Sequence, residues 1–419
     1  MRRRTSAGLA ALLALAVLAL AVPWAARAGD TPAPAGGYRI VHRDLSVAGA
    51  EHLGIVRDDG PVVANVLRLD PNSGLRLRTV LSGERVAGGA PAYENTTSMC
   101  RRVNCLFAVN ADFANLATGE PVGATVVDGQ FIRSPVPHHH QFMVGRDGNV
   151  SVGNLIWSGR VSDAGGLLQT PFTVGINGVN VSRQRDQVIV YTGNWAGSTG
   201  TGGDGVEIVA RVTDPGGPLP AGGSIGVELV EFRLGDSPIP PWGIVLSGTG
   251  QGADALRLMW AKSRKGEISS RLTVQIDSAG AERQTVGAYP VLVNEGRPVY
   301  LSARDGFTRS RHPRTIAGKT ADGTILLVTV DGRQPCCSIG MTLPEAADFM
   351  VALGAVEAVN LDGGGSTTFV AHGVMVNHPS NQLVFRNGRT VVDGTPGPGD
   401  LVLAHLERPV TTAIAVVRN

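Results

Sequence analysis

The stretch TILLVTV at residues 324–330 is almost continuously apolar, which is typical of a strand buried on both faces. Asp331 follows it directly. The sequence TLPE at residues 342–345 combines a capping box with a proline in the first turn, so a helix is predicted to begin there. A second apolar run, residues 356–361, ends at Asp362. These signals predict a strand–helix–strand unit.

A connection of this length fits a right-handed crossover between parallel strands. If the two strands are neighbours, Asp331 and Asp362 emerge at the same carboxyl edge, where open α/β sheets bind ligands. Neighbouring strands lie roughly 5 Å apart, and one intervening strand would roughly double that separation. A further apolar strand at residues 106–110 is expected to bring Asn110 and Asp112 near the same edge.

The rest of the chain is dominated by β signals. Short β-branched runs are separated by Gly, Pro, Asn and Asp, for example at residues 123–127, 187–192, 206–212 and 224–232. The Gly-rich residues 193–205 show no apolar period and are expected to form a surface loop. The predicted fold class is α+β: a β-rich mixed sheet with a few helices and one βαβ crossover at about residues 324–361.

Length and composition are those of a protein with a sizeable core. The chain has 419 residues, of which 43% are hydrophobic and 17% are charged. The formal net charge is only +2, which gives no reason to expect binding to nucleic acid or to an anionic membrane.

The N-terminus has the pattern of a secretory signal peptide. Three arginines at residues 2–4 precede an apolar run at about residues 7–22, and Ala26-Arg27-Ala28 fits the small-x-small cleavage rule. We expect cleavage after Ala28, a flexible linker at residues 29–37, and a secreted or extracytoplasmic protein that no longer contacts a membrane. The alternative is an uncleaved anchor, which the short apolar run disfavours.

The four cysteines form two local pairs, Cys100/Cys105 and Cys336/Cys337. Export would permit disulfides. A Cys100–Cys105 bridge would cross a helix-to-strand turn, whereas Cys336–Cys337 would be a vicinal bridge unless each cysteine pairs elsewhere. The sequence leaves this connectivity open. Neither pair has the Cys-x-x-Cys spacing that is typical of zinc sites.

The residues after Asp362, Gly363-Gly364-Gly365-Ser366-Thr367, suggest a ligand-binding loop. Glycines let a ligand approach the backbone closely, and successive N–H groups can form a nest for an anion. The alternative is a tight turn without a ligand. The loop lacks the lysine of a phosphate-binding P-loop, which disfavours nucleotide binding.

Six short motifs occur in a characteristic order. They are AVNADF (108–113), GEPVG (119–123), RTIAG (314–318), VDGR (330–333), NLDGGGST (360–367) and MVNHPS (375–380). Together they resemble the phosphodiester glycosidase family, whose bacterial members are exported and often linked to exopolysaccharides. The resemblance covers about residues 104–419 and implies a single domain over residues 38–419. Two features depart from the family pattern, namely Ala111 where glycine is common and the Cys336-Cys337 pair.

The resemblance implies hydrolysis of a sugar-1-phosphodiester at the anomeric C–O bond, with release of the sugar and a phosphomonoester. Because this leaving group is a weak base, the site needs an anion cradle and carboxylates more than a strong general acid. We expect Asp331 and Asp362 to be catalytic and Arg314 to bind phosphate in bidentate fashion. The other expected substrate-binding residues are Asn110, Asp112, Asn360, Gly363, Gly364, Gly365, Ser366, Thr367 and Asn377.

Several of these residues have structural alternatives. Either Asp-Gly dipeptide could only form a turn, Arg314 could form a structural ion pair, and Asn360 could be a buried amide. At the level of function, a non-catalytic module that binds cell-surface glycans and a phosphodiesterase that cleaves the P–O bond remain alternatives.

No cofactor or metal ion is expected. Consecutive histidines at residues 138–140 would alternate between faces of a strand, so they are poorly placed to bind one ion together. Asp186 and Asp204 could bind Ca²⁺, but neither lies in an Asp-x-Asp-x-Asp loop. The expected partner is a sugar-phosphate or an anionic cell-surface glycan.

Overall fold

The computed structural model describes residues 31–86, 93–163, 172–214, 219–278, 282–299, 301–302, 305–393 and 400–419. The expected signal peptide, residues 1–28, lies outside them. Strands outnumber helices throughout the described part, which confirms the predicted β-rich α+β class. No helix within these ranges is long and apolar enough to cross a bilayer.

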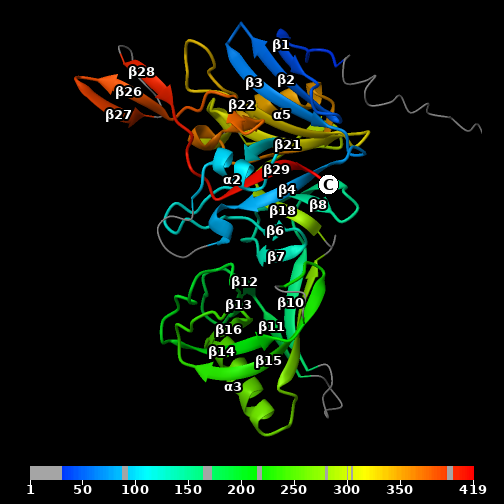
Figure 1. Ribbon diagram of the computed structural model, residues 1–419, viewed down its shortest axis with the longest axis vertical. Helices are drawn as coiled ribbons and strands as arrows, with labels where there is room; N and C mark the ends of the chain where they lie inside the picture. The colour runs from blue at the N-terminus through cyan, green and yellow to red at the C-terminus, as the bar shows by residue number, and fades with distance from the viewer. Residues whose placement is uncertain are drawn as a thin grey trace, which may run out of the picture.

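The molecule has two lobes joined by a narrow neck (Figure 1). The lower lobe is inserted between β9 (Val150–Gly153) and β18 (Glu282–Ala288), which belong to one sheet of the upper lobe. The chain therefore leaves the upper lobe after β9, forms the lower lobe, and returns to the upper lobe at β18.

The largest sheet of the upper lobe has the order β1-β2-β3-β22-β21-β23-β19-β20. Its strands are β1 (Tyr38–Asp44), β2 (Ala50–Arg57), β3 (Val62–Leu69), β22 (Ile325–Val330), β21 (Arg314–Thr320), β23 (Ala355–Asn360), β19 (Val291–Asn294) and β20 (Arg297–Pro298). Every residue of β22 is buried, as its continuous apolar sequence predicts.

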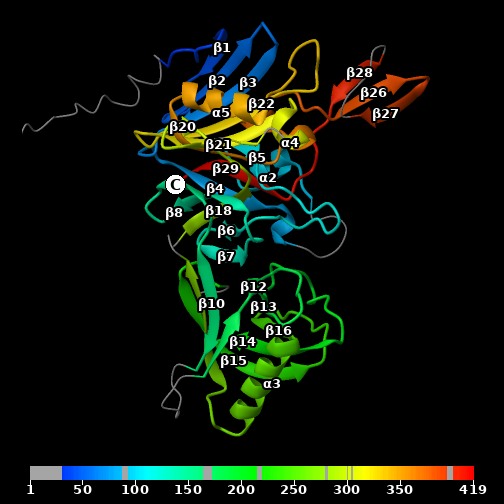
Figure 2. The ribbon, with the colours of Figure 1, turned by 180° about the vertical axis from the view of Figure 1, so that it is seen from behind.

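The helix predicted between the two apolar strands is α5 (Leu343–Ala352), which packs on one face of this sheet (Figure 2). Thr342 accepts a hydrogen bond from the Glu345 amide, and the Glu345 side chain accepts one from the Thr342 amide, so the capping box is present. Leu343 and Met350 are buried against the sheet. The helix is thus fixed both at its first turn and along its apolar face.

The strands on either side of α5 are not neighbours. β21 lies between β22 and β23 and pairs antiparallel with both, so β22 and β23 run in the same direction. The ends of these two strands therefore share one edge with the beginning of β21. That edge carries Asp331, Asp362 and Arg314.

Two five-stranded sheets complete the upper lobe, with the orders β25-β24-β5-β29-β4 and β7-β6-β18-β8-β9. An apolar core lies between them and the large sheet, and it includes Phe107, Leu327 and Val359. The remaining strands are β25 (Val374–Met375), β24 (Phe369–Ala371), β5 (Phe107–Asn110), β29 (Thr412–Arg418), β4 (Leu75–Leu81), β7 (Gln130–Arg133), β6 (Thr125–Val127) and β8 (His140–Gly145).

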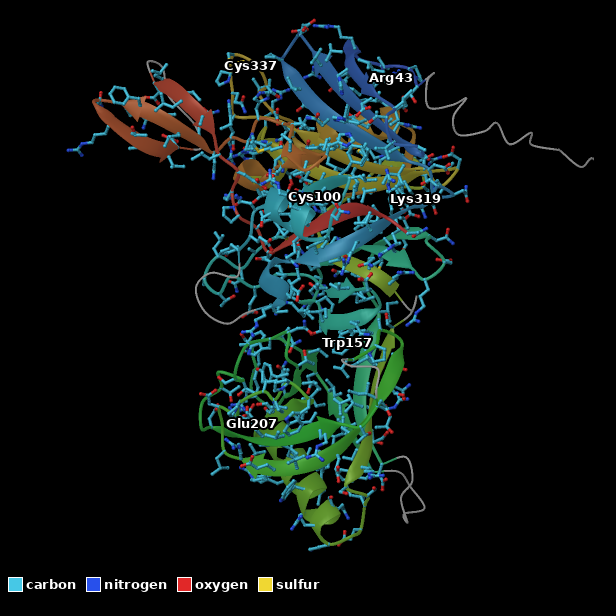
Figure 3. The ribbon with its side chains drawn as sticks, viewed as in Figure 1. Arg43, Cys100, Trp157, Glu207, Lys319 and Cys337 are labelled. Carbon is cyan, nitrogen blue, oxygen red and sulfur yellow. A yellow bond between two sulfur atoms is a disulfide. The ribbon has the colours of Figure 1, made fainter. Side chains whose placement is uncertain are left out.

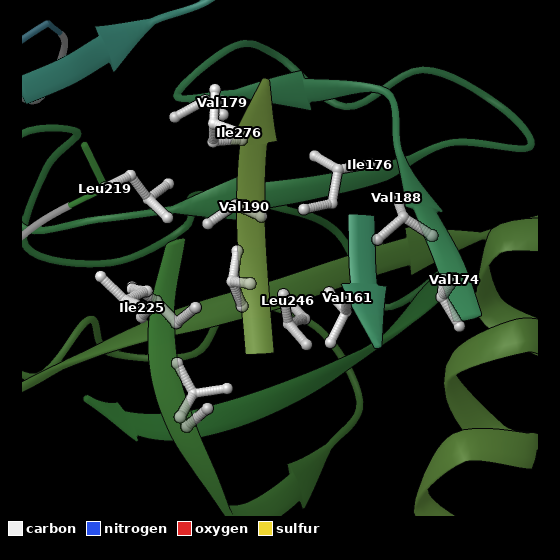
Figure 4. Close-up of a cluster of buried hydrophobic side chains, with 14 of the residues drawn as sticks. Val161, Val174, Ile176, Val179, Val188, Val190, Leu219, Ile225, Leu246 and Ile276 are labelled. Atoms are coloured by element: carbon white, nitrogen blue, oxygen red, sulfur yellow. The ribbon is translucent and has the colours of Figure 1, made fainter. Parts of the chain in front are cut away.

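The lower lobe is an eight-stranded sheet of order β11-β10-β17-β15-β14-β16-β13-β12, with α3 (Gly250–Arg264) packed against it. Branched side chains such as Val190, Leu246 and Ile276 fill its core (Figure 4). Its strands are β11 (Thr173–Ile176), β10 (Trp157–Ser162), β17 (Arg271–Ser278), β15 (Gly223–Arg233), β14 (Gly205–Val212), β16 (Gly243–Thr249), β13 (Val188–Tyr191) and β12 (Gly178–Val179).

A three-stranded sheet, β27 (Arg389–Asp393), β26 (Gln382–Arg386) and β28 (Leu401–His405), projects from the side of the upper lobe (Figures 1 and 2). The short helices are η1 (Ser82–Glu84), α2 (Thr96–Arg102), α4 (Gly306–Arg309) and η2 (Gly364–Ser366). Disulfides join Cys100 to Cys105 and Cys336 to Cys337, which resolves the connectivity that the sequence leaves open.

The capping box of α5 gives a direct test of local stability. Thr342→Ala removes the hydrogen bond to the Glu345 amide, so the free energy of unfolding should fall by about 1 kcal/mol in urea titrations. Glu345→Gln is the matched control, because glutamine keeps the capping box and removes only the ion pair with Arg311. An equal or larger loss in this control would contradict the importance of the cap.

Candidate functional site

A pocket of about 650 Å³ lies beside the carboxyl edge of the large sheet. Asp112 and Asp362 both line it, together with Ser366 and Arg408. We call it the carboxylate pocket. Two acidic side chains from distant parts of the chain therefore meet in one cavity, next to a basic group.

Asp112 follows β5 and is almost completely buried, with 1% of its surface exposed. Its Oδ2 accepts a hydrogen bond from the Gly123 amide at 2.8 Å. Its Oδ1 has no hydrogen-bond partner among the described residues and lies 3.8 Å from His139 Nε2. Burial raises the pKa of Asp112 to about 7, because the Gly123 and Phe113 amides and the charge of Arg133 do not replace the hydration of a carboxylate.

Gly287 of β18 forms the wall behind Asp112. A Cβ atom at this position would collide with both carboxylate oxygens of Asp112. The backbone of β18 can therefore approach the carboxyl group only because residue 287 has no side chain. This close contact removes water from one side of Asp112 and contributes to its burial.

Asp362 occupies a different electrostatic environment. Its carboxylate accepts hydrogen bonds from the Ser366 side chain and the Gly363 amide, and Oδ2 lies 3.8 Å from Arg408 Nη2. Burial raises the pKa of Asp362, while Ser366 and Arg408 act in the opposite direction. The anionic form of Asp362 thus has a hydroxyl, an amide and an arginine facing it, whereas Asp112 has the Gly123 and Phe113 amides and the charge of Arg133.

Asn110 was expected to contact substrate, but the structure places its amide inside the protein. Its Oδ1 accepts from Thr315 Oγ1 at 2.7 Å and from the Thr368 amide at 3.1 Å. Its Nδ2 donates to the main-chain oxygen of Asp362 at 2.6 Å. Asn110 therefore connects β5, β21 and the glycine loop, and it positions Asp362 indirectly.

The glycine loop does not form the open anion nest that its sequence suggests. The Gly364 amide donates to Pro313 O, the Ser366 amide to Gly363 O and the Thr367 amide to Gly364 O. The Gly363 amide faces the carboxylate of Asp362 itself. These amides are used within the protein, and substrate binding by the glycine loop stays a prediction.

Close packing explains two of these glycines. A Cβ atom on Gly363 would lie 2.6 Å from Pro313 O, and one on Gly365 would collide with Asn381 Oδ1. Gly364 has a φ of 64°, a backbone conformation that favours glycine. The three glycines therefore serve the path of the loop.

Asp331 lies at the predicted edge but does not line the carboxylate pocket. Its Oδ1 accepts from Asn377 Nδ2 at 3.0 Å, and its Oδ2 accepts from the His378 amide at 3.1 Å. Its carboxylate also raises the pKa of His378. Among the described residues, Asp112 and not Asp331 is the second acidic side chain in the pocket with Asp362.

The other expected substrate-binding side chains are also held by the protein. Arg314 donates to the carbonyl oxygens of Phe307, Ser310 and Met341. Asn377 accepts from the Phe369 amide and donates to Asp331 and Thr367 O, and Asn360 donates to Tyr289 O. Thr367 is completely buried, whereas Ser366 accepts from Arg408 at the pocket wall.

Arginines surround the glycine loop. Arg314 and Arg333 have no carboxylate within 4 Å among the described residues, and Arg408 lies 3.8 Å from Asp362. Burial and the charge of Arg333 lower the pKa of Arg314 to about 10, and burial and Arg408 lower that of Arg333. Uncompensated positive charge of this kind attracts an anion. Arg408 was missed in the sequence, because no local motif marks it.

The histidine triplet does not gather around one point. His138 is exposed, whereas the rings of His139 and His140 both stack on Tyr289, with centroids 5.8 Å away in each case. Within the described ranges, no group of three or more His, Cys, Asp or Glu side chains is arranged to hold a metal ion.

These features are those of a β-rich protein with paired carboxyl groups beside arginines. Residues 238–417 match the family model described as phosphodiester glycosidase. This match, over less than half of the chain, confirms the resemblance found in the sequence motifs.

Two curated relatives share short stretches of sequence with this chain. The N-acetylglucosamine-1-phosphodiester alpha-N-acetylglucosaminidase of Bos taurus is 41% identical over 68 residues, which is 16% of this chain and 12% of the relative. The Homo sapiens enzyme of the same name is 40% identical over 68 residues, or 13% of its length. The matches therefore span only a small part of these relatives.

Two solved structures share the fold over most of the chain. A hypothetical protein from Synechocystis is 19% identical, with a TM-score of 0.61, and the match covers 91% of this chain and 68% of that protein. A candidate exported protein from Burkholderia pseudomallei is 25% identical, with a TM-score of 0.60, and the match covers 86% and 75% of the two chains.

Gly287→Ala tests the close contact behind Asp112. The new methyl group collides with the carboxylate, so we expect a loss of about 1–3 kcal/mol in the free energy of unfolding. Gly175→Ala is the matched control, because Gly175 also lies in a strand and has open space around its Cβ position. Equal thermal stabilities of the two variants would contradict this packing.

The burial of Asp112 also predicts a pH dependence of stability. Its pKa is about 7 in the folded protein and near 4 when unfolded, so the folded state binds one more proton between these values. Stability should therefore fall as pH rises from about 4 to about 7, by up to about 1.4 kcal/mol per pH unit from this group. Asp112→Asn should remove that slope when the two proteins are compared by chemical unfolding. Parallel curves would contradict the raised pKa.

Proposed function

We propose that this protein is an extracytoplasmic hydrolase that cleaves a sugar-1-phosphodiester at the anomeric C–O bond. The observation that carries the proposal is the pair Asp112 and Asp362, which line one pocket in unequal environments. Burial raises the pKa of both carboxyl groups, and neighbouring carboxyl groups in different surroundings are suited to opposite roles in acid–base chemistry. The match of residues 238–417 to the phosphodiester glycosidase family model supports the same reaction class.

In this proposal Asp362 reacts in its anionic form and is the general base. Ser366, the Gly363 amide and Arg408 all stabilise its anionic form. As the bond between the anomeric carbon and the phosphate oxygen lengthens, the negative charge of Asp362 stabilises the positive charge that develops on the sugar ring. The incoming water forms the new C–O bond and gives its proton to Asp362.

Asp112 acts as the acid. With a pKa of about 7 it keeps its proton in mildly acidic and neutral solution, and its Oδ1 has no partner within the described structure. It can therefore donate this proton to the departing phosphate oxygen. The leaving phosphomonoester is a weak base, so a proton donor with this pKa is sufficient.

The phosphate is expected to lie against Arg408. This side chain lines the carboxylate pocket, and Arg333 lies behind it, close enough for the charge of each to act on the other. Arginine binds phosphate oxygens through parallel N–H donors. Both arginines lie beside the glycine loop, so both can stabilise the negative charge of the leaving phosphate.

The names of the mammalian relatives supply the first substrate to test. They are N-acetylglucosamine-1-phosphodiester alpha-N-acetylglucosaminidases, although the matched stretches are short. A methyl phosphodiester of N-acetylglucosamine 1-phosphate therefore serves as the probe. In ¹⁸O-labelled water, C–O cleavage places the label in the released sugar. Label in the phosphate would instead show P–O cleavage and would contradict the proposed reaction.

Three isosteric variants test the assignment of the carboxyl groups. Asp112→Asn and Asp362→Asn should each lower kcat by about 10²–10⁴-fold, because each removes a proton-transfer group. Asp331→Asn is the matched control, since Asp331 is buried outside the pocket; we expect less than tenfold loss in kcat and a destabilisation of about 1–2 kcal/mol. Losses in the control as large as those in Asp362→Asn would contradict the assignment.

A binding module without catalysis predicts a different result. In that case the wild type would bind wall glycans and release no sugar from any sugar-1-phosphodiester. The proposed enzyme should instead show activity that declines above about pH 7, as Asp112 loses its proton.

A further inference from the structure

A second cavity, of about 610 Å³, lies between the two lobes, and we call it the neck pocket. Three segments line it: residues 134–139 of the upper lobe, residues 154–157 at the start of the lower lobe, and residues between 181 and 187. Figure 3 shows Trp157, one of its lining residues, at the junction of the lobes. Asn115, Glu120, Arg133 and Asn177 also line it, so the neck pocket is built from both lobes and from the segment after β9 that joins them.

Buried polar groups at this pocket have unused hydrogen-bonding capacity. Arg133, of which 4% is exposed, forms an ion pair with Glu120 at 2.9 Å and donates to Asn180 O. Its Nε has no hydrogen-bond partner within the described structure, and neither has His139 Nε2. Such groups are usually satisfied in folded proteins, so Arg133 Nε points to a polar ligand, whereas His139 Nε2 faces Asp112 Oδ1 at 3.8 Å.

The pocket carries little net charge. The positive charge of Arg133 is matched by Glu120, and His139 is neutral at pH 7 because burial and His140 lower its pKa to about 4. This balance favours an uncharged ligand. This balance of charge also distinguishes the neck pocket from the carboxylate pocket, near which Arg314 and Arg333 have no carboxylate partner among the described residues.

The lining residues suit a saccharide. Asn154, Asn177 and Gln184 are exposed at the pocket, and carboxamides supply both the donors and the acceptors that sugar hydroxyls need. Trp157 and Ile156 add apolar surface against which the C–H face of a sugar ring can pack. A small number of polar groups on a mostly apolar wall is typical of small-molecule sites.

The two pockets share a wall. Phe113 and Asp112 line the carboxylate pocket, whereas His139 and Asn115 line the neck pocket. The rings of Phe113 and His139 meet edge to face with centroids 5.8 Å apart, and His139 Nε2 lies 3.8 Å from Asp112 Oδ1. The two pockets are therefore adjacent, as a substrate that occupies both of them requires.

We propose that the neck pocket binds neutral saccharide units, so that the substrate is an oligosaccharide or polysaccharide whose phosphodiester lies in the carboxylate pocket. That the bound saccharide belongs to the substrate rests on the proposed function; saccharide binding in the neck does not.

Isothermal titration calorimetry with the whole protein tests the neck pocket. The probes are chitotetraose, maltotetraose, cellotetraose and mannotetraose. At least one should bind the wild type, and Trp157→Ala should weaken its affinity at least tenfold. Trp242→Ala is the matched control, because Trp242 is an exposed tryptophan of the lower lobe outside both pockets, and its affinity should equal that of the wild type.

A second variant guards against misfolding, because Trp157 also packs on Phe131. Ile156 is 72% exposed, so Ile156→Arg should fold normally while its larger side chain obstructs the pocket, and it too should weaken binding at least tenfold. The proposal is overturned if no tetrasaccharide binds the wild type, or if Ile156→Arg binds as tightly as the wild type.

Activity on two substrates separates this inference from the proposed function. The ratio of kcat/KM for a phosphodiester that carries the bound tetrasaccharide to kcat/KM for the methyl phosphodiester should exceed ten in the wild type and fall toward one in Ile156→Arg. Saccharide binding without hydrolysis of either substrate would refute the proposed function and leave the neck site standing. Hydrolysis with equal kcat/KM for both substrates would refute the extension.

Discussion

The candidate site depends on one buried carboxamide, that of Asn110. Its three hydrogen bonds join the end of β5 to Thr315 of β21, which belongs to another sheet, and to the glycine loop. Because Asp112 follows β5 two residues later and Asp362 begins the loop, the same contacts bring both carboxyl groups to one cavity. Loss of a buried amide with three partners would leave each of those partners unsatisfied.

Asp112 and Asp362 are chemically identical groups that differ in burial and in the charges around them. Asp112 faces a glycine backbone, and burial outweighs the Gly123 and Phe113 amides and the charge of Arg133, so its pKa rises to about 7. Asp362 is partly buried, and a hydroxyl, an amide and Arg408 oppose the effect of burial on its pKa. Both carboxyl groups thus have raised pKa values, and of the two only Asp362 has, among the described residues, an arginine within 4 Å of its carboxylate. The proposed division of roles rests on this difference.

Much of this arrangement could be predicted from the sequence. The continuous apolar strands, the capping box and the strand end at Asn110 are local signals, and the structure has β22, α5 and β5 where they predict them. The role of the glycines could not be predicted, since their packing against Pro313 and Asn381 is a tertiary contact. Asp331 and Asp112 look equivalent as residues that follow strands, and only the partners of their oxygens distinguish them. α3 begins with a glycine-rich segment and carries no cap, so it was not expected.

The proposed mechanism requires Asp112 to be a buried, protonated acid in the pocket that also contains Asp362. Carbon-13 NMR of protein labelled at the aspartate carboxyl carbons measures this directly across a pH titration. We predict one resonance that titrates near pH 7 and is absent from Asp112→Asn. If every aspartate resonance titrated below about pH 5, within the ordinary range for exposed carboxyl groups, the account would be contradicted.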